Sequence, residues 1–108
     1  MINWNNMDTL ASYAALKAAE PVKLQAVMAG ESGAERVKKY SVPMGCGMDF
    51  NFGARPVNDE ILAIMADFAK EQQLVEKFAE LYNGAVINTG EKRRVLHHMC
   101  RGQLGEDV

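Results

Sequence analysis

Apolar side chains recur every three or four positions along much of this chain, which is the pattern of amphipathic helices. The clearest instance is predicted between Asn58 and about Gln72 or Gln73, with Asn58 as its N-cap and two acidic residues in the first turn. Its apolar positions are Ile61, Leu62, Ile64, Met65, Phe68 and Ala69. A further helix is predicted over 74–82 and ends at Asn83-Gly84. We expect the two helices to pack antiparallel across a tight junction near Gln72.

The first forty residues predict three shorter helices. The first follows Asp8, which we take as its N-cap, and ends before Pro21. The second covers Val22 to Met28 and stops at Gly30. The third starts at a capping box formed by Ser32 and Glu35 and runs to about Tyr40. We interpret its basic residues as a solvated face: Arg36, Lys38 and Lys39.

A strand is predicted at 48–52, where apolar and polar residues alternate. A lone short strand is not stable, so this segment must pair with another one, which the sequence does not identify. The preceding residues 41–47 contain Pro43 and two glycines and are predicted to be a loop. We regard Cys46 in this loop as incidental. The predicted fold class is mainly α, with several packed helices and one short β-strand or hairpin.

The composition limits the domain count and the possible partners of the protein, but it identifies no reactive chemistry. A length of 108 residues predicts one domain, and 48% hydrophobic with 24% charged residues is ordinary for a globular protein. The net charge of −2 gives no reason to expect a nucleic-acid partner. Cys46 and Cys100 form no CxxC pair, which favours reduced thiols and a cytoplasmic protein. The sequence has neither a signal peptide nor an apolar run of about 18 residues, so we expect no membrane association.

The stretch 83–101 carries the most specific residue order. Asn88 and Glu91 have capping-box spacing, and a helix is predicted after them. Its apolar stripe is Val95, Leu96, Met99 and Cys100, while Arg93, His97 and Arg101 share one side, with Arg94 and His98 beside them. Three interpretations are open for that polar side. They are a face that hydrogen-bonds to neighbouring segments, which we favour, a phosphate site of arginines at a helix start, and a metal site of His97, His98 and Cys100. The metal site is the weakest, because adjacent histidines diverge by about 100° around a helix.

The order of these residues resembles the glucose-6-phosphate isomerase family, which carries a stretch of the form N/S-G-x-x-I-N-x-T-E-x-R-x-V-L-H-x-x-x-R. The matching positions are Gly84, Ile87, Asn88, Glu91, Arg93, Val95, Leu96, His97 and Arg101. The segments 50–57 and 74–77 and the Asn58-Asp59-Glu60 helix start also look like this family, so the resemblance runs from about Glu35 onward. Gly90 departs from it, since many members have threonine directly before the glutamate.

The resemblance implies that residues 1–108 are a single N-terminal helical segment of an α/β enzyme whose two sugar-isomerase (SIS) domains are absent from this chain. The family interconverts glucose 6-phosphate and fructose 6-phosphate, an isomerase reaction of glycolysis and gluconeogenesis that needs no cofactor and no metal. Its phosphate-binding loop, glutamate base and ring-opening histidine lie further along, so the resemblance implies no catalytic, cofactor or metal residue here. In particular, His97 and His98 are not that histidine.

The segment itself is then expected to be structural and catalytically inactive in isolation. The implied partners are the remainder of the enzyme and a second subunit in a homodimer, with the sugar phosphate bound by the whole enzyme only. An alternative is an independent helical protein-interaction module without enzymatic activity. A third hypothesis, ranked lower, is a small phosphosugar binder using Arg93, His97 and Arg101.

Overall fold

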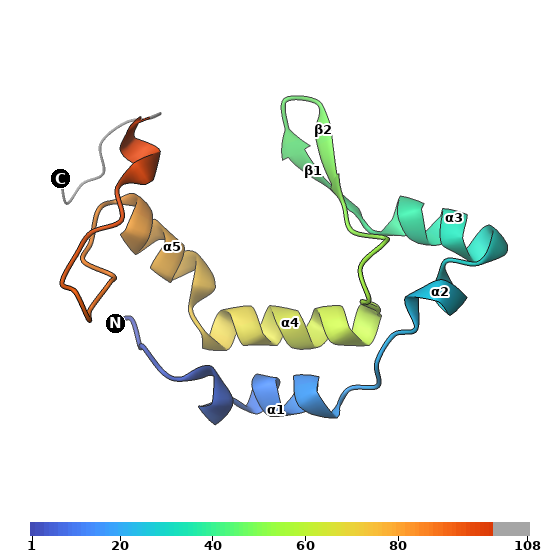
Figure 1. The fold of residues 1–108 in the computed structure, drawn as a ribbon, viewed down its shortest axis with the longest axis horizontal. Coiled ribbons are helices and arrows are strands. Elements are labelled where there is room, and N and C mark those ends of the chain that lie inside the picture. The colour runs from blue at the N-terminus through green and yellow to red at the C-terminus, as the bar shows by residue number, and fades with distance from the viewer. Residues whose placement is uncertain (101–108) are drawn as a thin grey trace. The chain divides into compact units, whose positions relative to one another are not determined.

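The computed structural model describes residues 1–100. These residues form two compact units, one made of 1–13 with 66–100 and the other of 14–65. Helices α1 (Ala11–Ala18) and α4 (Asp59–Glu71) each begin in one unit and end in the other (Figure 1). Each unit is described by itself below.

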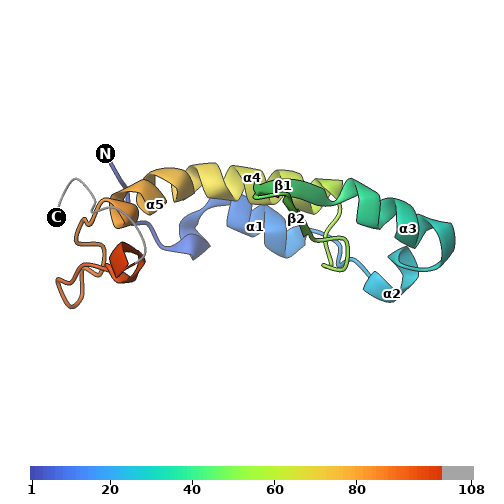
Figure 2. The same cartoon turned by 90° about the horizontal axis from the view of Figure 1, so that it is seen from above.

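The unit of residues 14–65 contains α2 (Leu24–Val27) and α3 (Gly30–Lys39), which lie next to each other in Figure 2. The close approach depends on Gly33, because a Cβ at that position would lie 2.2 Å from the backbone oxygen of Met28. The predicted helices are confirmed here, but two of their signals are wrong. Gly30 has a positive φ of 62° yet is the first residue of α3 rather than the stop of α2. Ser32 lies inside α3 and donates to Ala29 O at 2.7 Å, so it is not an N-cap.

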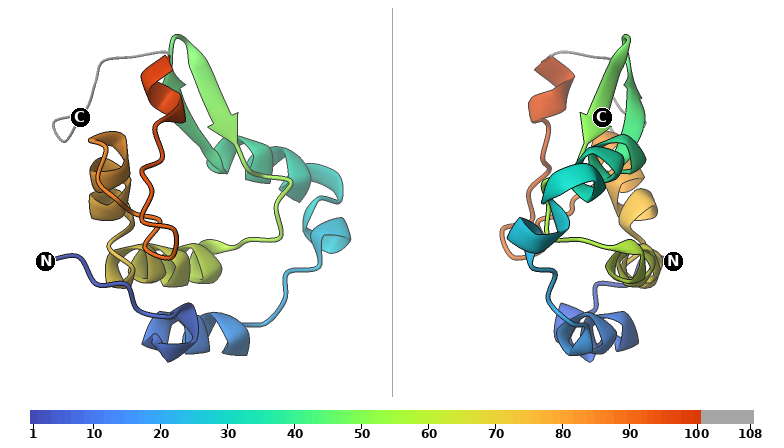
Figure 3. Two further views of the ribbon diagram at one scale, coloured as in Figure 1. Left: turned by 60° about the vertical axis from the view of Figure 1, so that its left-hand side comes forward. Right: turned by 90° about the vertical axis from the view of Figure 1, so that its right-hand side faces the viewer.

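A two-stranded antiparallel hairpin follows α3 (Figure 3). The predicted strand is confirmed as β2 (Met48–Asn51), and its partner is β1 (Ser41–Gly45), so the prediction of a loop over 41–47 is wrong. Ser41 pairs with Asn51, Val42 with Phe50 and Pro43 with Asp49; the register then shifts, and Gly45 pairs with Met48. Pro43 can occupy a strand here because a two-stranded sheet consists of edges.

The other unit holds the 3-10 helix η1 (Met7–Thr9), helix α5 (Leu74–Tyr82) and the 3-10 helix η2 (His97–Cys100). Asp8 lies inside η1, and α1 begins at Ala11, so Asp8 is not the N-cap of that helix. The N-terminal segment lies against the junction of α4 and α5. Gln73 accepts a hydrogen bond from Asn3 N at 2.8 Å and donates one to Met1 O at 3.1 Å.

The junction between α4 and α5 is tight, as predicted, because Gln73 adopts the left-handed conformation with φ 51°. Helix α5 does not pack along α4 beyond this junction, so the predicted antiparallel pair is wrong. The cap of α4 is confirmed, since Asn58 Oδ1 accepts from Ile61 N at 2.8 Å. The stop of α5 is also confirmed, with Gly84 at φ 89°.

The fold class is confirmed as mainly helical with one short β-hairpin. Within residues 1–100, the hydrophobic side chains that are buried are those of Tyr40 and Ile61, both in the unit of residues 14–65. None of the described helices combines the length and the apolar character needed to span a membrane.

Candidate functional site

The stretch from Asn83 onward does not form the predicted helix. Asn88 and Arg93 exchange backbone hydrogen bonds at 3.3 and 3.2 Å, and Lys92 between them has φ 53°. The predicted contact of the capping box is present, because Asn88 Oδ1 accepts from Glu91 N at 3.2 Å, but it closes a turn instead of starting a helix. An isolated helix shorter than about 12–15 residues is marginal in water, and Gly90 weakens this one further.

The polar side chains of this stretch therefore do not share a helix face. Arg93 lies 3.9 Å from the carboxylate of Glu91, and Arg101 is outside the described residues. The ring of His98 stacks on that of Tyr82 with centroids 4.8 Å apart, and its Nε2 lies 2.7 Å from Tyr82 O. His98 thus follows the favoured interpretation, a polar group that bonds to a neighbouring segment.

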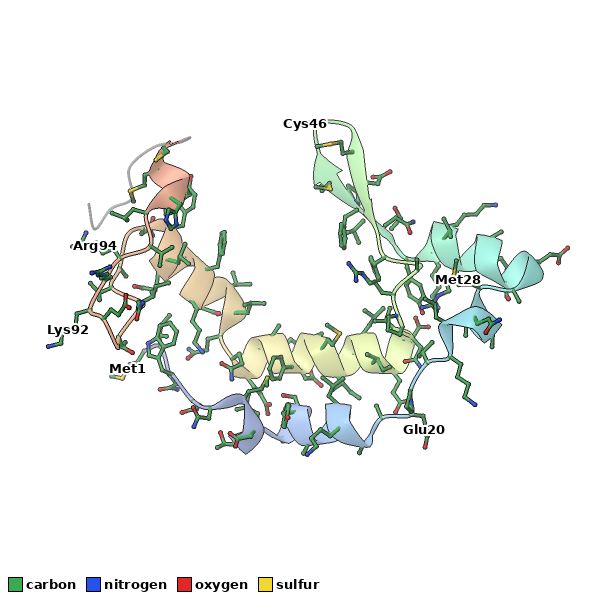
Figure 4. All side chains as sticks on the ribbon, viewed as in Figure 1. Met1, Glu20, Met28, Cys46, Lys92 and Arg94 are labelled. Atoms are coloured by element: carbon green, nitrogen blue, oxygen red, sulfur yellow. The ribbon has the colours of Figure 1, made fainter. Side chains whose placement is uncertain are left out.

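Figure 4 shows Lys92 and Arg94 on the turns that precede η2. Within residues 1–100, no group of three His, Cys, Asp or Glu side chains is arranged to hold a metal ion, so the histidine–cysteine metal site is not formed there. In this stretch Arg93 lies near Glu91 and His98 contacts Tyr82, so these two candidate residues engage different partners.

Arg36 on α3, which the sequence analysis placed on a solvated face, donates three side-chain hydrogen bonds. That assignment is wrong, because Arg36 is buried, with 9% of its surface exposed. Its Nε donates to Gly53 O at 2.7 Å, and its terminal nitrogen donates to Arg55 O at 2.7 Å and also to Val57 O. The guanidinium carbon lies 4.7 Å from the centre of the Tyr40 ring. Arg36 thus holds the whole connector between β2 and α4.

Asp59, the first residue of α4, joins the same group of side chains. Its carboxylate accepts from Lys39 Nζ at 2.5 Å and from Tyr40 Oη at 2.9 Å. The hydrogen bond from Lys39, followed by that from Tyr40, lowers the pKa of Asp59 below its ordinary value. The same contact with Asp59 raises the pKa of Lys39. Both groups are solvent-exposed, so this ion pair orients the start of α4 more than it stabilises the fold.

Arg36, Lys39, Tyr40 and Asp59 form a positioning cluster rather than a reactive one. The donors of Arg36 are directed at backbone oxygens, and the carboxylate of Asp59 is satisfied by Lys39 and Tyr40. No nucleophile–base pair accompanies them in the part of the chain that the structure describes. Sequence reasoning missed the cluster, although Arg36 and Tyr40 are four residues apart and so share one side of a helix.

Two cavities of about 540 Å³ lie within residues 14–65, and the first of them borders this cluster. The first lies over α3 and is lined by Ala26, Val27, Ser32, Glu35, Arg36, Lys39 and Tyr40. The second is almost entirely apolar and is lined by Val42, Phe50, Phe52, Arg55, Pro56, Val57, Leu62 and Met65. The lining of the second cavity contains no carboxylate. In the first, the hydroxyl of Ser32 donates to Ala29 O at 2.7 Å and not to Glu35, so no nucleophile–base pair is arranged in either cavity.

Helix α5 exposes its apolar residues instead of burying them. The exposed fractions are 58% for Leu74, 76% for Val75, 63% for Phe78 and 43% for Tyr82. Apolar residues at helical spacing are ordinarily buried against another element. A contiguous exposed apolar surface of this kind is typical of an interaction site.

Comparison with known proteins gives a consistent result. No family model matches the chain. The glucose-6-phosphate isomerase of Treponema pallidum is 47% identical over 100 residues, which are 93% of this chain and 19% of that protein. That of Treponema denticola is 46% identical over 112 residues, covering 99% of this chain and 21% of the relative. That of Borreliella afzelii is 35% identical over 109 residues, covering 100% and 20%.

The chain spans about a fifth of the length of the curated relatives that it matches. The similarity extends over nearly the whole chain, including the segments that contain Arg36 and α5. The resemblance inferred from the order of residues in 83–101 is confirmed by these relatives. The chain therefore belongs to the glucose-6-phosphate isomerase family.

Proposed function

We propose that this chain is the N-terminal part of a glucose-6-phosphate isomerase and that its role within that enzyme is structural rather than catalytic. The observation that carries the proposal is an identity of 46–47% to two Treponema isomerases along nearly all of this chain but only about a fifth of theirs. The enzyme as a whole would interconvert glucose 6-phosphate and fructose 6-phosphate in the cytoplasm, without a cofactor.

The contacts within the chain support a structural role. Arg36 and Asp59 are engaged in holding the connector and the start of α4, and His98 contacts Tyr82 O within the chain. The exposed apolar face of α5, formed by Leu74, Val75, Phe78 and Tyr82, supports an association with the SIS domains of the remaining chain. A homodimer in which this segment contacts a second subunit belongs to the same proposal.

Reconstitution tests this proposal directly. The remainder of the Treponema denticola isomerase, produced without the region that matches this chain, is mixed with the purified 108-residue chain. Fructose 6-phosphate formation is then followed in a coupled assay. We expect no turnover from the 108-residue chain alone and turnover from the mixture, because the chain would supply the missing packing surface. Turnover from the chain alone would contradict the structural role.

A matched pair of variants on α5 locates the contact. Phe78→Asp places a charge on the apolar face and should reduce turnover of the mixture, since burying an unpaired carboxylate is costly. Glu80→Gln changes an exposed position of the same helix and should leave turnover unchanged. If the chain does not bind the remainder at all, the result favours the alternative. That alternative is an independent helical interaction module, whose partners would be other proteins.

A further inference from the structure

Gln73, between α4 and α5, has a backbone conformation that glutamine rarely adopts. Its φ is 51° and its ψ is 47°, in the left-handed region that glycine occupies without strain. Glycine, and less often asparagine, is the usual residue where a helix ends in this conformation. A larger residue persists there only where its surroundings over-determine the conformation. The contacts of the Gln73 side chain identify those surroundings.

The side-chain amide of Gln73 is bonded at both ends to the N-terminal segment. Its Oε1 accepts a hydrogen bond from Asn3 N at 2.8 Å, and its Nε2 donates one to Met1 O at 3.1 Å. The amide thus pairs with that backbone as the peptide group of a neighbouring strand would. A glutamine side chain supplies both the donor and the acceptor for this pairing, whereas glycine supplies neither.

Two further side chains hold the same segment. Gln72 Nε2 donates to Asn5 O at 3.4 Å. The Nζ atom of Lys77 lies 4.9 Å from the centre of the Trp4 ring, within the range of a cation–π contact. Lys77 Nζ also donates to Gln72 Oε1 at 2.7 Å, which joins the two side chains to each other. All of these residues belong to the unit of 1–13 and 66–100.

We propose that residues 1–5 act as a strap that fixes the junction between α4 and α5 in its left-handed turn, with the Gln73 amide as the anchor. The strap is held on both sides of the junction, because Gln72 follows the end of α4 and Lys77 lies in the first turn of α5. Leu74, the first residue of the exposed apolar face of α5, directly follows Gln73, so the strap also fixes where that face begins. This consequence for docking rests on the proposed function, whereas the strap itself does not.

The test is amide hydrogen exchange of the natural full-length protein, measured by mass spectrometry over the junction. Lys77 N–H bonds to Gln73 O at 2.9 Å, and Gln73 N–H bonds to Lys70 O at 3.0 Å. Gln73→Met keeps the length of the side chain and the strained backbone but removes the donor and the acceptor. Exchange of these amides should become about fivefold faster or more. Asn3→Pro removes the N–H that Gln73 accepts and should accelerate the same amides about twofold or more.

A double variant and a control complete the experiment. The double variant Gln73→Met/Asn3→Pro should exchange no faster than Gln73→Met alone, because both substitutions remove the same contact. Asn6→Pro is the matched control in the same segment, since Asn6 already has the φ of −65° that proline requires, and it should leave exchange at the junction unchanged.

Two results would overturn the proposal. If Gln73→Met leaves exchange at the junction unchanged, Gln73 is not an anchor. If the accelerations of the two single variants multiply in the double variant, the two residues act separately and residues 1–5 are not a strap. Circular dichroism spectra that match those of the unsubstituted protein confirm that each variant folds. Absence of isomerase turnover in the unsubstituted full-length protein would contradict the proposed function and leave the exchange result as it stands.

Discussion

Replacing Arg36 by methionine tests whether this one side chain holds the connector between β2 and α4. Arg36→Met keeps most of the apolar stem and removes the hydrogen-bond donors to Gly53 O, Arg55 O and Val57 O. A control of the same chemical type is Lys38→Met, because Lys38 is an exposed cation on the same helix. Exposed substitutions ordinarily change stability by less than about 0.5 kcal/mol.

The size of the destabilisation depends on whether water can replace the Arg36 side chain as the hydrogen-bond donor at each carbonyl oxygen. Hydrogen bonds to a charged group contribute about 1.5–3 kcal/mol each, so losing all three without replacement would cost roughly 4.5–9 kcal/mol. Gly53 is buried, but Arg55 is exposed and Val57 is half-buried, so water can reach the latter two oxygens. The full cost therefore applies mainly at Gly53. We expect a local destabilisation of about 2–3 kcal/mol.

Amide hydrogen exchange measured by NMR reports the local destabilisation at the connector between β2 and α4. Gly53 N–H bonds to Asn51 Oδ1, and Arg55 N–H bonds to Phe52 O, both at 3.0 Å. A local loss of 2–3 kcal/mol corresponds to exchange roughly 30- to 150-fold faster at these amides, at 1.4 kcal/mol for each factor of ten. If Arg36→Met accelerates exchange no more than Lys38→Met does, the assignment of Arg36 as the residue that holds the connector is refuted.

Two further predictions concern the same unit of residues 14–65. The pKa of Asp59 is lowered from 3.8, chiefly by its hydrogen bond from Lys39, so the associated stability is present above pH 3.8 and lost as pH falls through the folded-state pKa. Lys39→Met should raise the pKa of Asp59 measured by carboxyl-carbon NMR, and an unmoved pKa would contradict the assigned cause. Gly33→Ala should cost about 1–3 kcal/mol of unfolding free energy in urea titrations, because its Cβ would lie 2.2 Å from Met28 O. Glu35→Ala on the same helix is the control, and equal unfolding midpoints for the two variants would mean that α2 shifts freely.

Features governed by neighbouring residues were predicted well. The cap of α4 at Asn58 and the stop of α5 at Gly84 were predicted because each depends on atoms within about four residues. The two long helices followed from apolar periodicity alone, and the family followed from the order of residues in 83–101. The same periodicity did not predict how helices pack, since α5 does not pack along α4 beyond the junction at Gln73.

Features that depend on distant partners were missed. Arg36 reads as a solvent-exposed cation in a basic run, but its acceptors lie 17 to 21 residues further along the chain. Residues 41–45 resemble a loop because of Pro43 and Gly45, and they become a strand only through pairing with β2. The capping contact of Asn88 was predicted correctly, yet a contact of that kind closes a turn as readily as it starts a helix.

The sequence by itself thus determined the family, the fold class and the elements whose signals are local. The tertiary structure decided which charged side chain is buried and which segment completes the hairpin. The physical reason is that caps and helical periodicity act over three or four residues, whereas a buried arginine or a paired strand is stabilised by groups remote in sequence. Arg36 and β1 show this difference most directly, since neither can be assigned without its partner.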